Sequence, residues 1–234
     1  MRDVIRREMT RREVAAGLVA LPMLGAVGAR AASAARVVIV GGGAGGATVA
    51  VTLKRAVPLL DVTLIEPEQD YTSCFHSNHY LGGFVPVERI THGYDGLAAL
   101  GVTLVRDRAV GFDFTGREVS TEGGASIGYD RLVVAPGIGF MKDEIEGYDD
   151  AAREVMPHAW SGGVQVRALR SQIEAMEDGG LVVIAPPRNP YRCPPGPYER
   201  ACLIAHYLKT TKPKSKVVVI DPKMAYSKQA VFEE

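Results

Sequence analysis

Three glycines with a characteristic spacing, Gly41, Gly43 and Gly46, directly follow four apolar residues at 37–40. The first glycine permits a tight turn, the second leaves room for a pyrophosphate, and the third lets a helix pack closely on the strand. A helix expected at 47–57 would point its free N–H groups and positive dipole end at two phosphates. The spacing therefore predicts a dinucleotide-binding turn, whose candidate cofactor-binding residues are Gly41, Gly43, Ala44, Gly45 and Gly46.

Glu66 supplies the acidic residue that a dinucleotide-binding unit has at the end of its second strand. A second apolar strand is expected at Val62–Ile65, and it ends on Glu66, twenty residues after Gly46. The Glu66 carboxylate can accept hydrogen bonds from an adenosine ribose, and it would repel a 2′-phosphate. Strand, turn, helix and second strand make a complete βαβ unit, which favours a nucleotide site over an ordinary glycine-rich turn.

A second pattern of strand and small residues lies at 129–137 and ends in Ala135 and Gly137. Alternating apolar residues and turn glycines at 106–129 predict an antiparallel meander before it, and a further strand is expected at Val102–Val105 after a short helical stretch. We expect the strand at 129–137 to return beside the first strand, where a small residue allows close approach of a cofactor. The two patterns together predict an FAD-binding domain.

Cys74 lies in a polar and aromatic segment, 70–83, which is bounded by glycines and is typical of a loop. The loop follows the second strand, at the sheet edge where ligands bind. With His76 and His79, Cys74 offers metal donors, but no fourth ligand is nearby and no metal site is assigned. A buried small hydrophobe is the plain alternative for this cysteine.

A second nucleotide-like unit follows at 181–221, after a predicted loop and linker at 147–163 and a predicted amphipathic helix at 164–176. Its strands are expected at 181–185 and 216–221 and its helix at 198–208. The turn at 185–197 is rich in proline, which lacks an N–H donor and adds bulk where a pyrophosphate would approach. We therefore expect a nicotinamide-type domain without its phosphate site, and no electron exchange with NAD(P)H.

The amino-acid composition gives no sign of a nucleic-acid-binding or membrane-surface protein. In 234 residues, Lys+Arg and Asp+Glu balance at 27 each, so bulk charge gives no reason to expect nucleic acid or an anionic membrane as a partner. Apolar residues make up 47% and charged residues 23%, as in an ordinary soluble protein with a sizeable core.

The first 34 residues have the order of an export signal. A twin arginine, Arg11–Arg12, precedes an apolar run at 14–27 and a small-residue stretch at 29–34. The apolar run is short for a membrane span, so we expect no integral span in the mature chain. Cleavage after Ala31 or Ala34 would deliver the protein to the bacterial periplasm; a frayed basic terminus on a cytosolic protein is the alternative.

Two nucleotide-type domains in this order resemble the glutathione-reductase-like flavoproteins. More specifically, the chain resembles the flavoprotein subunit of flavocytochrome c sulfide dehydrogenase from Arg36 onward. Four motifs carry the resemblance: Tyr191–Ala201 around Cys193, Cys74 with Ser77–Asn78, His92–Leu97, and Tyr226–Gln229.

The resemblance implies a role for each cysteine. Cys193 would be the catalytic half of a redox-active disulfide facing the flavin, and Cys74 would hold FAD covalently through a thioether. Sulfide would attack the disulfide, with Arg188, Arg192 and Arg200 as residues that attract the hydrosulfide anion or are solvated at the surface. Cys202, nine residues after Cys193, is expected to be a packing residue.

The resemblance also implies a partner. The chain has no Cys-x-x-Cys-His motif, so a haem would belong to a c-type, dihaem cytochrome subunit that accepts electrons one at a time. The family's second redox cysteine has no counterpart here, so we expect a chain truncated at its C-terminus that does not turn over sulfide by itself. The alternatives are a sulfide:quinone reductase-like oxidoreductase and a non-catalytic flavin-binding fragment.

The sequence thus predicts an α/β protein with the glutathione-reductase-like FAD/NAD(P)-binding Rossmann fold and two nucleotide-type domains, the second incomplete. We place the export signal at 1–34, the first part of the FAD-binding domain at 35–147, and the second Rossmann-like domain at 148–234. The expected activity is FAD-dependent oxidation of sulfide to sulfur or polysulfide.

Overall fold

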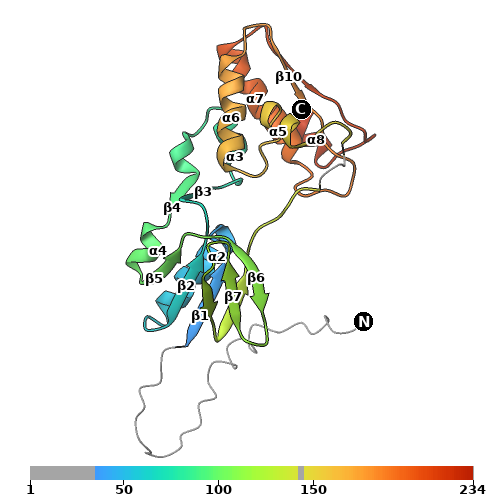
Figure 1. The fold of residues 1–234 in the computed structure, drawn as a ribbon. Helices are drawn as coiled ribbons and strands as arrows, with labels where there is room; N and C mark the ends of the chain where they lie inside the picture. Colours follow the sequence, from blue (N-terminus) through green and yellow to red (C-terminus); the bar gives the residue numbers. More distant parts are fainter. Residues whose placement is uncertain (1–34, 142–144, 234) are drawn as a thin grey trace, which may run out of the picture. The chain divides into compact units, whose positions relative to one another are not determined.

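The computed structural model describes residues 35–141 and 145–233 (Figure 1). The predicted export signal at 1–34 lies outside the described residues. The described residues belong to one compact unit.

The first sheet has four parallel strands in the order β5-β2-β1-β9. β1 and β9 are paired as predicted, with Val37 opposite Arg131, so the chain does return beside the first strand. The strands are β1 (Arg36–Val40), β2 (Asp61–Ile65), β5 (Val102–Val105) and β9 (Arg131–Val134).

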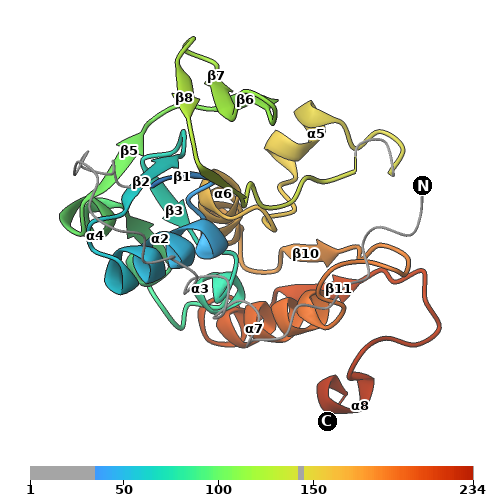
Figure 2. The ribbon, with the colours of Figure 1, turned by 90° about the horizontal axis from the view of Figure 1, so that it is seen from below.

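Both faces of this sheet are covered, which is why β1 is apolar at every position after Arg36. Val37 and Ile39 pack on the side of α2 (Ala44–Ala56) and α4 (Asp95–Ala99). Val38 and Val40 pack on the other side, against residues of the predicted meander. Figure 2 shows α2 and the meander on opposite sides of β1 and β2. The meander strands are β6 (Ala109–Asp113), β7 (Glu118–Thr121) and β8 (Ser126–Gly128).

The segment predicted as a loop at 70–83 contains regular structure, so that prediction is wrong in part. It holds β3 (Asp70–Thr72), which pairs with β4 (Thr91–Gly93), and α3 (Ser77–Leu81). The 3-10 helix η1 (Val87–Arg89) lies between α3 and β4 in the sequence. Tertiary packing explains the difference, because Leu81 at the end of α3 is fully buried in the core of the second unit.

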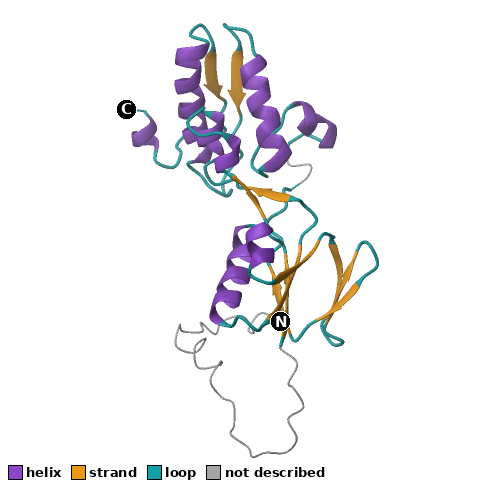
Figure 3. Ribbon diagram, turned by 90° about the vertical axis from the view of Figure 1, so that its left-hand side faces the viewer, coloured by secondary structure: helices purple, strands orange, loops and turns teal. Residues whose placement is uncertain are grey.

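The second unit is a βαβ unit, as predicted. β10 (Leu181–Ile184) and β11 (Lys216–Val219) are parallel and joined through α7 (Gly196–Thr211). Figure 3 shows the parallel strands of both units in orange with helices packed beside them. The other helices are α6 (Gly163–Ala175), α8 (Gln229–Phe232) and α5 (Asp150–Val155).

Helix α5 corrects the prediction of a loop and linker at 147–163. It begins at a capped turn, in which the Asp149 carboxylate accepts a hydrogen bond of 2.9 Å from the Ala152 amide. This cap satisfies one of the free N–H groups at the start of a helix.

Only one face of the β10–β11 sheet is covered in the described part of the chain. Val182 and Val217 pack against a core formed with α6 and α7. The alternate residues on the other face are between 40% and 60% exposed: Leu181, Val183, Val218 and Ile220.

Candidate active site

The glycine turn has the geometry that its spacing predicts. Gly41 has a φ of +97°, and a methyl group added there would lie 2.2 Å from the Ala135 carbonyl oxygen. A methyl group on Gly46 would lie 1.8 Å from the Gly41 carbonyl oxygen. Both positions therefore exclude a side chain, the first because β9 turns beside it and the second because α2 packs onto the turn.

Helix α2 begins at Ala44, three residues earlier than predicted, with Gly43 as its N-cap. No side chain caps it and no acidic residue lies in its first turn, so its first N–H groups and positive dipole end remain available for an anion. A methyl group on Gly43 would be 3.5 Å from the Tyr71 ring, which leaves the approach to these groups open. Gly45 is exposed on the same turn.

Glu66 lies against the glycine turn. Its carboxylate accepts hydrogen bonds from the amides of Gly42 (2.7 Å) and Glu68 (2.9 Å). Tyr94 closes the other side of the turn, because a methyl group on Gly42 would be 2.7 Å from its ring. Burial, and then the nearby Glu66 charge, raise the pKa of Tyr94 to about 12, so its hydroxyl is protonated at neutral pH.

A cavity of about 480 Å³ borders the turn. The start and one side of α2, the β3–β4 pair and α4 form its wall. The residues nearest the turn are Gly42, Gly43, Ala44, Thr48, Tyr71 and Tyr94. The cavity thus lies where the free N–H groups of α2 begin.

Cys74 is exposed and lies just before α3. Its carbonyl oxygen accepts from the Ser77 amide at 3.2 Å, which starts the helix. Ser77 Oγ is buried without a hydrogen-bond partner. The neighbouring backbone is tightly packed, because a methyl group on Gly162 would be 2.2 Å from the Thr72 carbonyl oxygen.

Cys193 is also exposed, so it is not a buried loop cysteine. It has a left-handed backbone with a φ of +57°, and its carbonyl oxygen accepts from the Gly196 amide at 2.9 Å. A methyl group on Gly196 would lie 3.1 Å from both Cys193 Sγ and the Trp160 ring. The sulfur therefore lies beside the N-terminus of α7, where the helix dipole favours negative charge.

Cys202 is exposed, so the expectation that it is a packing residue is wrong. The buried face of α7 contains Arg200, Ile204 and Leu208, and Cys202 lies on the opposite side of the helix. It is a free thiol on the helix surface.

Arg200 joins the segments that carry the motifs. Its Nε donates to Asn78 Oδ1 on α3 at 2.8 Å, and its two terminal nitrogens donate to the carbonyl oxygens of His158 (2.6 Å) and Ala159 (3.2 Å). Its guanidinium lies 3.4 Å from the centre of the Trp160 ring. At 4% exposure it is not one of the solvated surface arginines considered above.

The guanidinium of Arg200 is buried. Burial lowers its pKa to about 9, while the negative charge of the neighbouring Glu199 opposes that change. It therefore carries a positive charge at neutral pH, on the Trp160 ring that borders Gly196 together with Cys193 Sγ.

Comparison with known proteins connects this geometry to a family. Residues 35–169, more than half of the chain, match the family model for pyridine nucleotide-disulphide oxidoreductases. This chain belongs to that family. Residues 166–234 match the model for the central part of the flavoprotein chain of flavocytochrome c sulfide dehydrogenase, which confirms the resemblance stated from the motifs.

Individual relatives agree with this assignment. The flavocytochrome c sulfide dehydrogenase flavoprotein chain of Chlorobaculum thiosulfatiphilum is 49% identical over 43 residues, which are 18% of this chain and 90% of that sequence. The sulfide:quinone oxidoreductase of Aquifex aeolicus matches 80% of this chain and 43% of its own, with 25% identity and a TM-score of 0.60. The water-forming NADH oxidase of Lactobacillus brevis matches 80% and 40%, with 19% identity and a TM-score of 0.61. The predicted FAD/NAD(P)-binding fold is confirmed, and this chain spans less than half the length of these solved structures.

Membership of the pyridine nucleotide-disulphide oxidoreductase family and the flavoprotein relative imply an FAD cofactor. The residues present fit one. Gly41 and Gly46 make a turn that a side chain would fill, and the first N–H groups of α2 are free. The buried, unpartnered Ser77 Oγ beside Cys74 is the kind of group that a bound ligand satisfies.

The second unit also has an acidic residue just after its second strand. At the end of β11, Asp221 accepts a short hydrogen bond from the Tyr198 hydroxyl, and its other oxygen is 2.7 Å from Lys223 Nζ. Burial opposes ionisation of Asp221, but the bonds from Lys223 and Tyr198 lower its pKa. Lys223 also donates to the Pro187 carbonyl in the proline-rich turn. The carboxylate at the strand end is thus already paired within the protein.

Sequence reasoning missed Gly42, and it named Asn78 and Arg200 without the hydrogen bond that joins them. Gly42 occupies an unrestricted position of the glycine pattern, and only the Tyr94 ring explains it. The burial of Arg200 could have been predicted, because Arg200, Ile204 and Leu208 share one helical face. No group of three or more potential metal ligands is arranged to hold a metal within the described ranges.

Proposed function

We propose that this chain is the flavin-binding part of an FAD-dependent sulfide dehydrogenase that passes electrons to a c-type cytochrome. The observation that carries the proposal is the exposed Cys193 at the start of α7. It lies within the segment that matches the sulfide dehydrogenase flavoprotein, and Arg200 ties that segment to the Cys74 segment.

The first unit would hold the cofactor. The amides at the start of α2 would bind the pyrophosphate, with Gly43, Ala44 and Gly45 closest to it, and Ala135 and Gly137 would lie on the opposite side of the turn. Glu66 would accept from the ribose in addition to its present amide donors. Cys74 would form a thioether to the flavin ring. Bound FAD would accept two electrons at once and release them singly.

Cys193 would carry the sulfur chemistry. Hydrosulfide attacks a disulfide sulfur at Cys193, which forms a persulfide there and releases the partner cysteine as a thiolate that holds the electron pair. The nearby Arg200 charge and the α7 N-terminus stabilise negative charge at this point. The three cysteines of this chain are free thiols in the structure, so the proposal leaves the partner sulfur to be identified.

Sulfide oxidation with a quinone as acceptor is the second candidate. The structural match to a sulfide:quinone oxidoreductase at 25% identity favours it. In the described part of the chain, no helix is long and apolar enough to cross a membrane. The export signal expected at 1–34 supports the cytochrome reading, because it would place the enzyme in the periplasm, where c-type cytochromes could accept its electrons.

Flavin binding is tested first. The chain is loaded with FAD and precipitated with acid, and the peptide that carries Cys74 is weighed by mass spectrometry. We expect a yellow pellet and a flavin-sized mass increase, both lost in Cys74→Ser. Colour entirely in the supernatant of the wild type would rule out covalent attachment, and absence of bound flavin would refute the proposed function.

Sulfide chemistry is tested with protein expressed from the complete gene, loaded with FAD and kept anaerobic. Sulfide should bleach the flavin absorbance in the wild type and in the control Cys202→Ser, but not in Cys193→Ser. Reoxidation by a c-type cytochrome, and not by a soluble quinone, is expected. Equal bleaching in Cys193→Ser would remove this cysteine from the mechanism, and reoxidation by quinone alone would favour the second candidate.

A further inference from the structure

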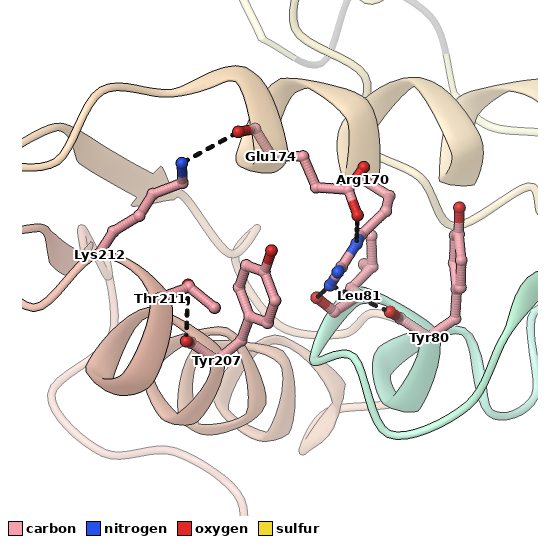
Figure 4. Close-up of polar contacts among 7 residues, drawn as sticks. All are labelled: Tyr80, Leu81, Arg170, Glu174, Tyr207, Thr211 and Lys212. Atoms are coloured by element: carbon pink, nitrogen blue, oxygen red, sulfur yellow. Dashed lines mark hydrogen bonds and ion pairs between the residues drawn. The ribbon is translucent and has the colours of Figure 1, made fainter.

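Two arginines hold α3, the helix that follows Cys74. Arg170 on α6 binds its C-terminal end, where its guanidinium donates to the Leu81 carbonyl at 2.8 Å and stacks on the Tyr207 ring at 4.1 Å (Figure 4). Arg200 on α7 binds its N-terminal end through Asn78. Arg200 also lies on the Trp160 ring, which borders Gly196 together with Cys193 Sγ.

Asn78 on α3 forms hydrogen bonds to three residues of α7. Its Oδ1 accepts from Arg200, while its Nδ2 donates to the Gly196 carbonyl (3.2 Å) and to the Glu199 carboxylate (2.6 Å). Asn78 is 6% exposed and Arg200 4%. Because both groups are buried, loss of either leaves unpaired polar atoms in the interior.

The same guanidinium reaches the Cys193 turn through Trp160. It lies on one indole ring whose edge, like Cys193 Sγ, borders Gly196. A planar guanidinium can stack on a ring and donate in three directions at once, which a lysine cannot do. Arg200 therefore bonds to the Cys74 segment directly and reaches the Cys193 turn through the Trp160 ring.

We infer that Arg200 is a positioning residue, which fixes the Cys74 segment and the Cys193 turn relative to one another and keeps a positive charge beside Cys193. This inference rests on the proposed function for its meaning, because both cysteines would have to meet one flavin. It does not depend on any particular electron acceptor.

The experiment compares Arg200→Gln with the matched control Arg170→Gln, both in the full chain without cofactor. Iodoacetamide alkylates each cysteine, and the rates at Cys193 and Cys202 are resolved by peptide mass spectrometry. The ratio of the two rates cancels general effects on stability. We expect Arg200→Gln to lower this ratio about fivefold, because reactive cysteines depend on a positive environment, and Arg170→Gln to leave it unchanged.

A spectroscopic signal accompanies the chemistry. Trp160 is the chain's single tryptophan, so the emission reports on the surroundings of that one ring. Arg200→Gln removes the guanidinium that lies on this ring, so it should shift the emission of the folded protein, whereas Arg170→Gln should leave it unchanged. An unchanged alkylation ratio in folded Arg200→Gln would overturn the inference, whatever the loss of stability.

Asn78→Ala serves if Arg200→Gln does not fold. It cuts the link to α3 but leaves the guanidinium beside Cys193, so the alkylation ratio should stay as in the wild type while FAD attachment at Cys74 falls severalfold. Full attachment in Asn78→Ala would overturn the positioning role. Absence of flavin from the wild type would instead count against the proposed function, because the alkylation ratio is measured without flavin.

Discussion

Replacing Gly46 with alanine tests whether close packing of α2 on β1 builds the dinucleotide turn. The new methyl group would lie 1.8 Å from the Gly41 carbonyl oxygen and 3.2 Å from Ile39 Cγ2. Because the first neighbour is backbone, either the turn or the start of α2 has to move by about 1 Å or more. Overpacking costs about 1–3 kcal/mol, and a backbone displacement places Gly46→Ala at the upper end of that range.

Gly45→Ala is the matched control, one residue away in the same helix. Its methyl group would meet only Ala135 Cβ, at 3.8 Å, which is ordinary contact. Both substitutions gain the same helix propensity, up to about 1 kcal/mol, so the difference between them isolates the steric effect.

We expect Gly46→Ala to be less stable than Gly45→Ala by about 3 kcal/mol, measured by urea unfolding followed by circular dichroism. Gly46→Ala should also fail to retain FAD, because the turn has moved. Equal unfolding midpoints for the two variants would refute the reasoning.

Three further predictions follow from the site. NADH at micromolar concentration should not bleach the bound flavin, because the turn at 185–197 is rich in proline and Asp221 is already paired; rapid bleaching would show the opposite. Glu66→Gln should weaken FAD binding about tenfold, since a charged acceptor to the ribose becomes neutral; fluorescence titration with FAD measures this, and unchanged affinity would remove Glu66 from the site. Burial, with the charges of Arg153 and Arg200, lowers the pKa of His158 below 6.5. The unfolded chain therefore binds the proton first, and His158 contributes stability above pH 6.5 that is lost as the pH falls through the folded pKa; thermal melts from pH 7.5 to 5 should show this loss in the wild type and less of it in His158→Gln.

The elements of the first sheet could be predicted because several independent signals agree there. Continuous apolar residues, the glycine spacing and the carboxylate after Ile65 all indicate the same βαβ unit, and the structure has it. Helices α3 and α5 were missed because five or six residues are too few for a helical period to appear. What forms α3 is the burial of Leu81 in the other unit, which no local pattern records.

The sequence identified most residues of the candidate site, but it did not show which of them contact one another. The motifs pointed to Cys74, Cys193 and the glycine turn from the sequence alone. That Arg200 joins the Cys74 and Cys193 segments depends on contacts across more than a hundred positions. The exposure of Cys202 was misjudged because its place on α7 was not compared with the buried face defined by Ile204 and Leu208.

The sheet of the second unit, which the described residues cover on one face only, limits the protein concentration at which this chain stays monomeric. Four apolar side chains on its open face, and strand edges unpaired within the described residues, favour contact with a second molecule as concentration rises. Rates measured on this chain describe a single molecule only if they stay constant on dilution. A lysine in place of the 50%-exposed Val183 would leave the covered face intact and keep the protein dispersed at the concentrations that NMR or scattering requires.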